Sequence, residues 1–220
     1  LSRVLGWNRT RATAEQALAD GSIDAIATEA LYKEADLVII GLYPQATVDW
    51  LLENMPKMKK GCVIVDMVGV KQFMVDHLEQ AALDAGVHYV GGHPMAGSEK
   101  TGYESSTDHL LENAYYIITP TKKSTPEQID RIRQVALGIG ALPIVLDYHE
   151  HDFSVAAISH LPHLVASSLV NLVHDNDSKD EIMKRLAAGG FKDITRIASS
   201  SPVMWEQICM TNTENILVLL

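Results

Sequence analysis

The sequence predicts an α/β fold with a doubly wound parallel sheet in its first two-thirds, followed by an all-helical domain. Short apolar runs rich in β-branched residues alternate with amphipathic helical patterns, and this alternation stops near residue 148. Strands covered by helices on both faces are nearly continuous in apolar character, and strand–helix–strand alternation favours a parallel sheet. The expected strands lie at residues 2–7, 35–44, 61–68, 87–92, 114–120 and 141–148.

Helical patterns lie between most of these runs, and their ends carry helix-capping residues. Thr125 is suited to cap the last helix, Pro126 fits its first position, and Gln128 completes a capping box. Gly86 and Gly140 stand where two of the helices are expected to end. The four patterns cover residues 12–21, 46–58, 71–86 and 125–140.

The remainder of the chain reads as helix without an evident strand. Residues 151–173 predict a helix that Pro162 kinks or breaks near Ser159. The expected domains are therefore residues 1–148 and residues 149–220. Further helical patterns follow a polar link, at residues 181–190, at residues 191–201 and from Ser201 onward.

Composition limits the classes of partner. The chain has 220 residues, 47% of them hydrophobic, and a formal net charge of −10. This charge argues against nucleic acid as a partner, although a few local Arg or Lys residues still suffice for a small anion. The two cysteines, Cys62 and Cys209, cannot form a disulfide framework, which suits the cytoplasm. No apolar run approaches the roughly 18 residues of a membrane span, so we expect no membrane association.

Four segments follow the expected strands at the edge where ligands bind in doubly wound sheets. A helical domain packed over that edge would close a cleft. The third segment is residues 66–71 and the fourth is residues 91–97, which contains His93. The first two segments are Asn8, Arg9 and Thr10, and Leu42, Tyr43 and Pro44.

His93 is the main candidate for a catalytic group, although a histidine near a strand end is often only a structural hydrogen-bonding residue. Gly91, Gly92, Pro94 and Gly97 surround it and constrain the backbone more than an ordinary turn requires. This constraint favours the functional interpretation.

Other signals are weaker. His160 and His163 have metal-ligand spacing, but HExxH is absent and the cysteines are distant in sequence, so we expect no metal site. Taken alone, Arg196 reads more readily as a surface charge, whereas residues 8–10 read equally well as a solvated turn. A nucleophile elbow, a Walker A loop and a GxGxxG loop are absent, and the last absence is a gap in a nucleotide-binding interpretation.

Taken together, four long segments resemble the prephenate dehydrogenase family of tyrosine biosynthesis. They occur in the family's order. The resemblance implies a Rossmann-like dinucleotide-binding domain and a C-terminal helical domain that forms a homodimer. It also implies NAD(P)-dependent oxidative decarboxylation of prephenate to 4-hydroxyphenylpyruvate. The segments are residues 91–102, 110–120, 151–171 and 189–205.

The resemblance also implies residue roles. His93 matches the partner of the substrate hydroxyl and the expected general base, because a histidine pKa lies near working pH. Arg196 matches the arginine that binds a substrate carboxylate, for which its planar fork is suited. Glu99 matches a position near the substrate. The polar lining contributed by the helical domain is matched by Ser159, His160, His163, Lys192 and Asp193.

The cofactor prediction rests on the turn after the first expected strand. A site that prefers NAD usually has Asp or Glu there, which repels a 2′-phosphate. Asn8 has no such charge, Arg9 is able to pair with a phosphate, and Thr10 is able to donate to it. The sequence therefore slightly favours NADP, or use of both cofactors. The alternative is NAD with Arg9 and Arg11 as solvated turn residues.

Two departures from the family pattern and several alternatives remain. Gly69 stands where the family often has a serine that orients the base, so this role is either filled by water or Ser98 or dispensed with. The chain opens on Leu1 in mid-element, and we expect the first strand and its glycine loop to precede it. Alternative functions are an arogenate dehydrogenase, another two-domain dehydrogenase of the hydroxyacid or 6-phosphogluconate type, and a non-enzymatic ligand-sensing or dimerisation module.

Overall fold

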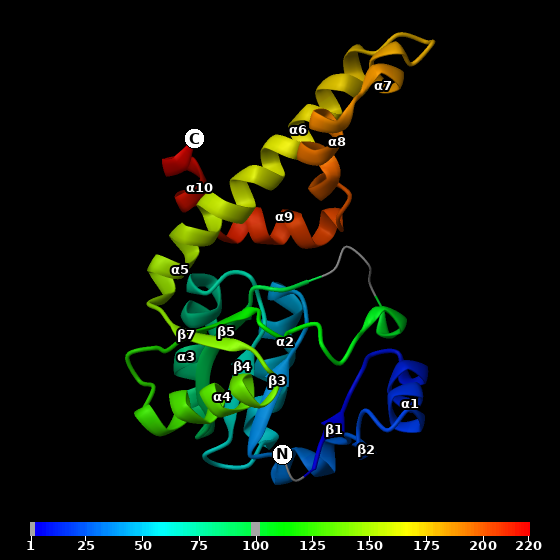
Figure 1. Ribbon diagram of the computed structural model, residues 1–220. Helices are drawn as coiled ribbons and strands as arrows, with labels where there is room; N and C mark the ends of the chain where they lie inside the picture. The colour runs from blue at the N-terminus through cyan, green and yellow to red at the C-terminus, as the bar shows by residue number, and fades with distance from the viewer. Residues whose placement is uncertain (1–2, 98–101) are drawn as a thin grey trace.

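A computed structural model describes residues 3–97 and 102–220. Figure 1 shows a sheet flanked by helices, with an elongated group of helices standing over one of its edges. The predicted fold class is confirmed: a Rossmann-like, mostly parallel sheet is followed by a helical domain.

The main sheet has five strands in chain order. Pairing is parallel from β3 to β5 and again between β6 and β7, but β6 runs antiparallel to β5. The expectation of an entirely parallel sheet is therefore wrong at this pair. In the described part of the connection from β5 to β6 the chain forms only one short 3-10 turn, not the crossover helix that a parallel pair requires. The strands are β3 (Leu37–Ile40), β4 (Val63–Asp66), β5 (His88–Pro94), β6 (Tyr115–Thr119) and β7 (Leu142–Val145).

A separate two-stranded sheet precedes the main one. Strands β1 (Leu5–Gly6) and β2 (Ala25–Ile26) pair in parallel, and α1 (Arg11–Ala19) joins them. The sequence analysis missed β2 because a strand of two residues leaves no apolar run. Trp7 connects this unit to the main domain through its ring, whose centroid lies 5.9 Å from that of Trp50.

Helices cover both faces of the main sheet, as the side-chain alternation in β4 shows. Ile64 packs into a core that includes residues of α2 and α3, whereas Val63 and Val65 pack into another core that includes residues of α4. The predicted capping box of Thr125 and Gln128 is present at the start of α4. These helices are α2 (Pro44–Asn54), α3 (Gln72–Ala85) and α4 (Pro126–Gly138), with 3-10 turns η1 (Glu29–Glu34), η2 (Met55–Lys57) and η3 (Tyr103–Ser105).

The helical domain begins with one long helix in three parts. A π-helical segment, η4 (Ala156–His160), joins α5 (Tyr148–Val155) to α6 (Leu161–Asn176). Pro162 has no N–H to donate, and the helix accommodates this with a local change in hydrogen-bond pattern instead of the expected break. The remaining elements are α7 (Ile182–Leu186), α8 (Gly189–Thr195), η5 (Arg196–Ala198), α9 (Pro202–Thr211) and α10 (Thr213–Leu219).

The long helix bears on two expectations from the sequence, the lack of a membrane-spanning segment and the domain boundary after residue 148. Its 29 residues, Tyr148–Asn176, have the length and composition of a membrane span, with a hydropathy of 1.4 over an 18-residue window that is 28% buried. The expectation that no segment approaches such a span is wrong, because polar residues between the apolar ones do not exclude it. The criterion alone is weak evidence for a membrane, since core helices of soluble proteins also meet it. The helix begins at Tyr148, and the domain boundary after residue 148 stays a prediction.

Candidate active site

His93 lies at the carboxyl end of β5, where two buried glycines allow other elements to approach closely. A Cβ atom on Gly91 would clash with the side-chain oxygen of Thr119. A Cβ atom on Gly92 would lie 2.6 Å from the Val65 side chain and 2.7 Å from the Asp66 carbonyl oxygen. Any larger residue at these positions would push β5 away from its neighbours. The glycines therefore fix the position of the His93 backbone.

A buried ion pair between Lys71 and Asp66 joins the ends of β4 and β5 beside His93. The Lys71 ammonium donates to the Asp66 Oδ2 atom at 2.8 Å and to the Gly92 carbonyl oxygen at 2.6 Å. Tyr89 donates its hydroxyl to the same carboxylate at 2.8 Å. Burial lowers the pKa of Lys71, and the Asp66 carboxylate opposes this shift. The pair was not predicted from the sequence, where its signal is two charged residues, Asp66 and Lys71, within an apolar run.

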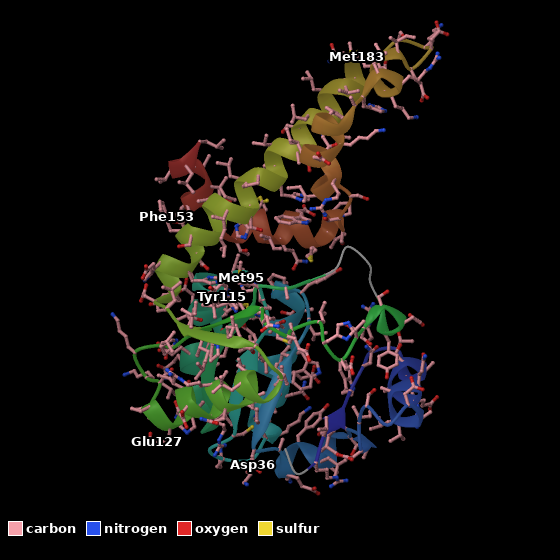
Figure 2. All side chains as sticks on the ribbon, viewed as in Figure 1. Asp36, Met95, Tyr115, Glu127, Phe153 and Met183 are labelled. Atoms are coloured by element: carbon pink, nitrogen blue, oxygen red, sulfur yellow. The ribbon has the colours of Figure 1, made fainter. Side chains whose placement is uncertain are left out.

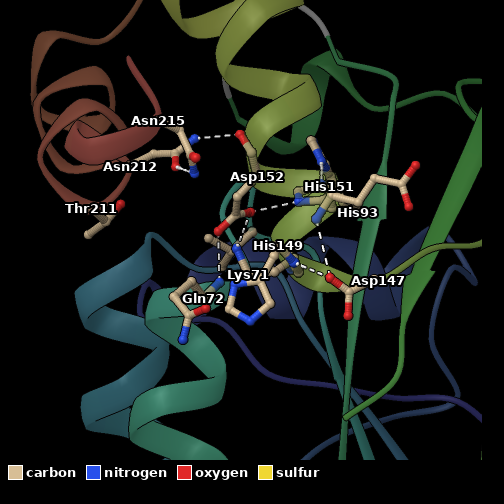
Figure 3. Close-up of polar contacts among 12 residues, drawn as sticks. Lys71, Gln72, His93, Asp147, His149, His151, Asp152, Thr211, Asn212 and Asn215 are labelled. Carbon is tan, nitrogen blue, oxygen red and sulfur yellow. Dashed lines mark hydrogen bonds and ion pairs between the residues drawn. The ribbon is translucent and has the colours of Figure 1, made fainter. Parts of the chain in front are cut away.

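His93 also contacts the first helix of the other domain. Its Nδ1 atom lies 2.8 Å from Nε2 of His151, and Nδ1 of His151 lies 2.7 Å from Oδ1 of Asp152. The Asp152 carboxylate accepts from the backbone N–H groups of Lys71 and Gln72, each at 2.8 Å, and so caps α3 (Figure 3). Sequence reasoning missed both roles, although adjacent His and Asp residues at the start of a predicted helix were visible.

The environment of His93 favours its neutral form. Burial lowers the pKa of His93 well below its usual value, and the nearby Lys71, His151 and His160 lower it further. The ring is therefore unprotonated near neutral pH and has one nitrogen available to accept a proton.

His160 is buried and is held by Asn212. The Asn212 amide nitrogen lies 2.8 Å from the carbonyl oxygen of Asp152 and 3.1 Å from Nδ1 of His160. The carbonyl oxygen only accepts, so this atom is the amide donor and Nδ1 of His160 is an acceptor. Burial lowers the pKa of His160 to about 4. The neutral ring therefore carries its proton on Nε2, where it serves as a hydrogen-bond donor.

His163 stacks on Trp205 of α9, with ring centroids 3.6 Å apart and planes 5° apart. Burial lowers the pKa of His163, and a hydrogen bond to the backbone of Ile197 opposes this shift. The contact brings η5, which starts at Arg196, next to α6. Trp205 was not among the predicted site residues. Among the described residues, no group of three or more His, Cys, Asp or Glu side chains could hold a metal ion.

The other predicted substrate residues differ in position. Ser159 is half-buried in the π-helical segment, whereas Lys192, Asp193 and Arg196 are exposed on α8 and η5. Within the described ranges, the hydrogen bonds that join His93 to His160 include neither Lys192 nor Asp193. Glu99 lies outside the described residues. The roles of these residues stay predictions.

The predicted cofactor segments lie at the ends of β1 and β3. Asn8, Arg9 and Thr10 are exposed, and the Asn8 side-chain oxygen accepts from the Thr10 N–H at 2.8 Å. This bond closes a turn and leaves the Asn8 amide nitrogen available as a donor. Leu42, Tyr43 and Pro44 lead into α2, with Tyr43 at its N-cap and Pro44 at its first position.

These segments fit a nucleotide in two respects. A helix N-terminus favours phosphate groups, and a Cβ atom built on Gly41 would meet no other atom within 4 Å. In the first turn of α2, the backbone N–H of Gln45 donates to the side-chain oxygen of Gln207 at 3.3 Å. No carboxylate stands at Asn8, so an additional ribose phosphate would meet no repulsive charge there.

Comparison with known proteins gives matches along almost the whole chain. The family model described as "Prephenate dehydrogenase, nucleotide-binding domain" matches residues 2–145, and "Prephenate dehydrogenase, dimerization domain" matches residues 147–220. The chain is 39% identical over 218 residues to a prephenate dehydrogenase of Bacillus subtilis, covering 98% of this chain and 58% of that protein. It is 36% identical over 183 residues to a prephenate dehydrogenase of Lactococcus lactis, covering 83% of this chain and 50% of that protein.

A solved structure gives the same result for the fold. The crystal structure of prephenate dehydrogenase from A. aeolicus, in complex with hydroxyphenyl propionate and NAD+, matches with a TM-score of 0.90 and 30% identity. The match covers 99% of this chain and 76% of that chain. The present chain thus spans between half and three-quarters of the lengths of these relatives.

Proposed function

This chain belongs to the prephenate dehydrogenase family, and we propose that the protein oxidises and decarboxylates prephenate to 4-hydroxyphenylpyruvate with NAD or NADP. One observation carries this function. His93, a half-buried histidine whose pKa is lowered, lies near the end of the strand at which the nucleotide-binding and helical domains meet. A neutral imidazole at that edge is suited to accept the proton of a substrate hydroxyl.

The reaction assigns a clear task to His93. When bound, the nicotinamide supplies the oxidising group that takes the hydrogen and its electron pair from the ring carbon bearing the hydroxyl. His93 accepts the hydroxyl proton as that carbon becomes a carbonyl. The ring carboxylate then leaves as CO2, and the electrons of the broken bond complete the aromatic ring and leave the former hydroxyl oxygen as a phenolate. His93 returns its proton to this oxygen, which gives 4-hydroxyphenylpyruvate and restores the neutral imidazole. His93 is thus a neutral imidazole before the reaction and becomes charged only while it holds the substrate proton.

The substrate carries two carboxylates, and we propose that the helical domain holds it. Arg196 binds one carboxylate through its guanidinium. His160 is neutral and presents an N–H donor, which suits a substrate oxygen. Ser159, His163, Lys192 and Asp193 complete the polar lining in this proposal, and Glu99 lies near the substrate.

For the cofactor we propose use of both NAD and NADP, with NADP slightly favoured. Asn8, Arg9 and Thr10 would face the adenine ribose, and Leu42, Tyr43 and Pro44 would lie along the dinucleotide. The absence of a carboxylate at Asn8 and the exposed guanidinium of Arg9 support this preference. The related structure from A. aeolicus contains NAD+, which supports use of the unphosphorylated cofactor as well.

We further propose that the protein is a cytoplasmic homodimer that assembles through its helical domain. Large apolar side chains are exposed along these helices, and Figure 2 labels two of them, Phe153 and Met183. Ile158 is 67% exposed and Leu186 is 75% exposed. Two such faces would cover each other in a dimer. A cytoplasmic location and the lack of nucleic-acid and membrane partners stay predictions.

The function is tested with the full-length protein and purified prephenate. We expect reduction of NAD or NADP with equal amounts of CO2 and of a product that absorbs as 4-hydroxyphenylpyruvate in alkali. Arogenate is the first comparison substrate, and 6-phosphogluconate and 3-hydroxyacids are the second. Higher kcat/KM with arogenate, or turnover of hydroxyacids alone, would replace this proposal. Ligand binding without turnover would favour the sensing module.

A further inference from the structure

We propose that His151 and Asp152 are positioning residues that hold the ring proton of His93 on Nδ1 and leave Nε2 as the base. This inference deepens the proposed function and rests on it for its kinetic consequence. The protonation state it assigns to His93 does not depend on the substrate. The carrying observation is the continuous series of contacts from His93 through His151 to Asp152.

The series starts from the carboxylate, which only accepts hydrogen bonds when ionised. Asp152 receives the N–H groups of Lys71 and Gln72 and also contacts Nδ1 of His151 at 2.7 Å. His151 must therefore donate from Nδ1. In a neutral ring, the proton on Nδ1 leaves a lone pair on Nε2.

That lone pair determines the tautomer of His93. Nε2 of His151 lies 2.8 Å from Nδ1 of His93, so His93 donates from Nδ1. Its own lone pair is then on Nε2. A Cβ atom built on Gly69 would lie 3.7 Å from this Nε2 atom, with no closer heavy atom than the imidazole itself. The available lone pair of His93 is thus on the ring nitrogen that lies next to Gly69.

Because residue 69 is a glycine in this chain, the orientation of the His93 ring depends more strongly on His151. A residue with a hydroxyl at that position could orient the base from its Nε2 side, and glycine cannot. Among the described residues, the His93 ring has its side-chain hydrogen bond with His151. The orientation of the base therefore depends on a residue from the helical domain.

The same contacts form a path along which the positive charge can move after His93 accepts a proton. Uptake of the hydroxyl proton at Nε2 makes His93 an imidazolium, which is close to the cationic Lys71. His93 is then able to pass its Nδ1 proton to Nε2 of His151. The resulting His151 imidazolium is paired with the Asp152 carboxylate. The positive charge then lies beside the Asp152 carboxylate. The reverse transfer restores the proton on Nδ1 of His93 when Nε2 returns its proton to the phenolate oxygen of the product.

A purely structural role is the competing explanation, because Asp152 caps α3 and His151 is fully buried. Two substitutions separate the roles. His151→Gln keeps an acceptor oxygen near the position of Nε2, whereas His151→Leu removes the acceptor and fills a similar volume. His149→Leu, on the exposed side of the same helix, is the matched control.

Kinetics with prephenate provide the first readout. We expect His151→Leu to lower kcat by about 100-fold, within the usual range for impaired general-base catalysis, with little change in KM for the cofactor. His151→Gln should recover most of this loss, and His149→Leu should match the wild type. Equal losses in the Leu and Gln variants, or a Leu variant within about threefold of wild type, would overturn the proposal.

The second readout needs no activity. Histidine labelled with ¹⁵N distinguishes protonated from unprotonated ring nitrogens, and the His93 signals are assigned by their loss in His93→Asn. Wild-type His93 should be protonated on Nδ1, and His151→Leu should redistribute the proton toward Nε2. A wild-type proton on Nε2 would overturn the inference even if prephenate is turned over. A proton on Nδ1 without any turnover would instead refute the proposed function and leave the tautomer assignment standing.

Discussion

The side chains of His93 and His151 meet ring to ring, Nδ1 to Nε2 at 2.8 Å, although 58 positions separate them in the sequence. The first belongs to the central sheet and the second to the first helix of the helical domain. Correct orientation of His93 therefore requires that both domains occupy their described positions. The predictions for His93, Gly69 and His160 concern the residues around this contact between the two domains.

His93→Asn should retain the fold and lose catalysis. The backbone is fixed by Gly91 and Gly92, and asparagine is smaller and still polar, so the melting temperature should change little. Loss of a general base lowers kcat by roughly 10²- to 10⁴-fold. The measurement is steady-state turnover of prephenate together with cofactor binding. His109→Asn, which removes an exposed histidine, is the control. Turnover within about threefold of wild type would remove His93 from the base role.

Gly69→Ser should lower KM for prephenate by roughly 2- to 10-fold, which corresponds to one added hydrogen bond. The added Cβ atom would be at ordinary contact distance from His93, and its hydroxyl would reach Nε2 and the neighbouring substrate oxygen. Gly69→Ala supplies the Cβ atom without the hydroxyl and is the matched control. If the alanine variant shows the same gain, the hydroxyl is not its cause.

His160→Asn should weaken the dependence of stability on acidic pH. The pKa of His160 falls from 6.5 to about 4 on burial, so the folded state needs the neutral ring. Its contribution is fully present above pH 6.5 and is lost as pH falls toward 4. For a shift of this size, the loss is about 3 kcal/mol. Asparagine keeps an acceptor for Asn212 and does not titrate.

The measurement for His160 is the free energy of unfolding by urea at several pH values between 7 and 4 for both proteins. Carboxylates titrate in this range too, so the difference between wild type and variant is the informative quantity. Curves that stay parallel over the whole range would show that His160 is protonated normally in the folded protein.

Arg196→Ala should raise KM for prephenate by roughly 10- to 100-fold, because hydrogen bonds to a charged group contribute about 1.5–3 kcal/mol. KM for NAD and NADP should stay close to the wild-type values. Arg185→Ala, in which an exposed arginine of α7 is removed, is the control. Equal increases in KM for substrate and cofactor would show that Arg196 does not face the substrate.

Asn8→Asp should shift the cofactor preference toward NAD. An aspartate would keep the bond to the Thr10 N–H and direct a negative charge at a 2′-phosphate. The measurement is kcat/KM with each cofactor at fixed prephenate. Arg11→Ala should have no effect, because the Arg11 side chain pairs with Glu15 at 2.8 Å. A wild type that favours NAD more than about tenfold, together with an unresponsive Asn8→Asp, would contradict the NADP preference.

Patterns within short segments were sufficient for most of the fold. Each of the six apolar runs overlaps a strand, and the capping box of Thr125 and Gln128 formed as its residues predicted. Strand direction was different: the apolar character of β6 does not reveal that it runs against β5. The helical pattern around Pro162 likewise gave no information on whether the helix breaks or adopts π geometry.

The candidate site likewise has residues that the sequence alone predicted and residues that it did not. His93 was visible because glycines and proline around it form a local pattern. His151, Asp152 and Lys71 were not assigned, because their roles depend on contacts between segments that are distant in sequence. A histidine and an aspartate at the start of a helix are common surface residues, and only the packing of α5 against α3 makes them part of the site.

The capping of α3 by Asp152 has a mechanical consequence. The carboxylate joins the first turn of α3 to the middle of α5, so this part of α5 moves as a rigid extension of the nucleotide-binding domain. The next five residues, Ala156–His160, are the π-helical segment. Any hinge between the two domains is thereby displaced from the chain boundary near residue 148 to this segment. A hinge there would carry His160 with the helical domain while leaving His151 attached to the nucleotide-binding domain, and it would break the bridge that Asn212 makes between the Asp152 carbonyl oxygen and His160. Opening would therefore move the histidine proposed to bind the substrate away from the proposed base, while the contact between His151 and His93 stays in place.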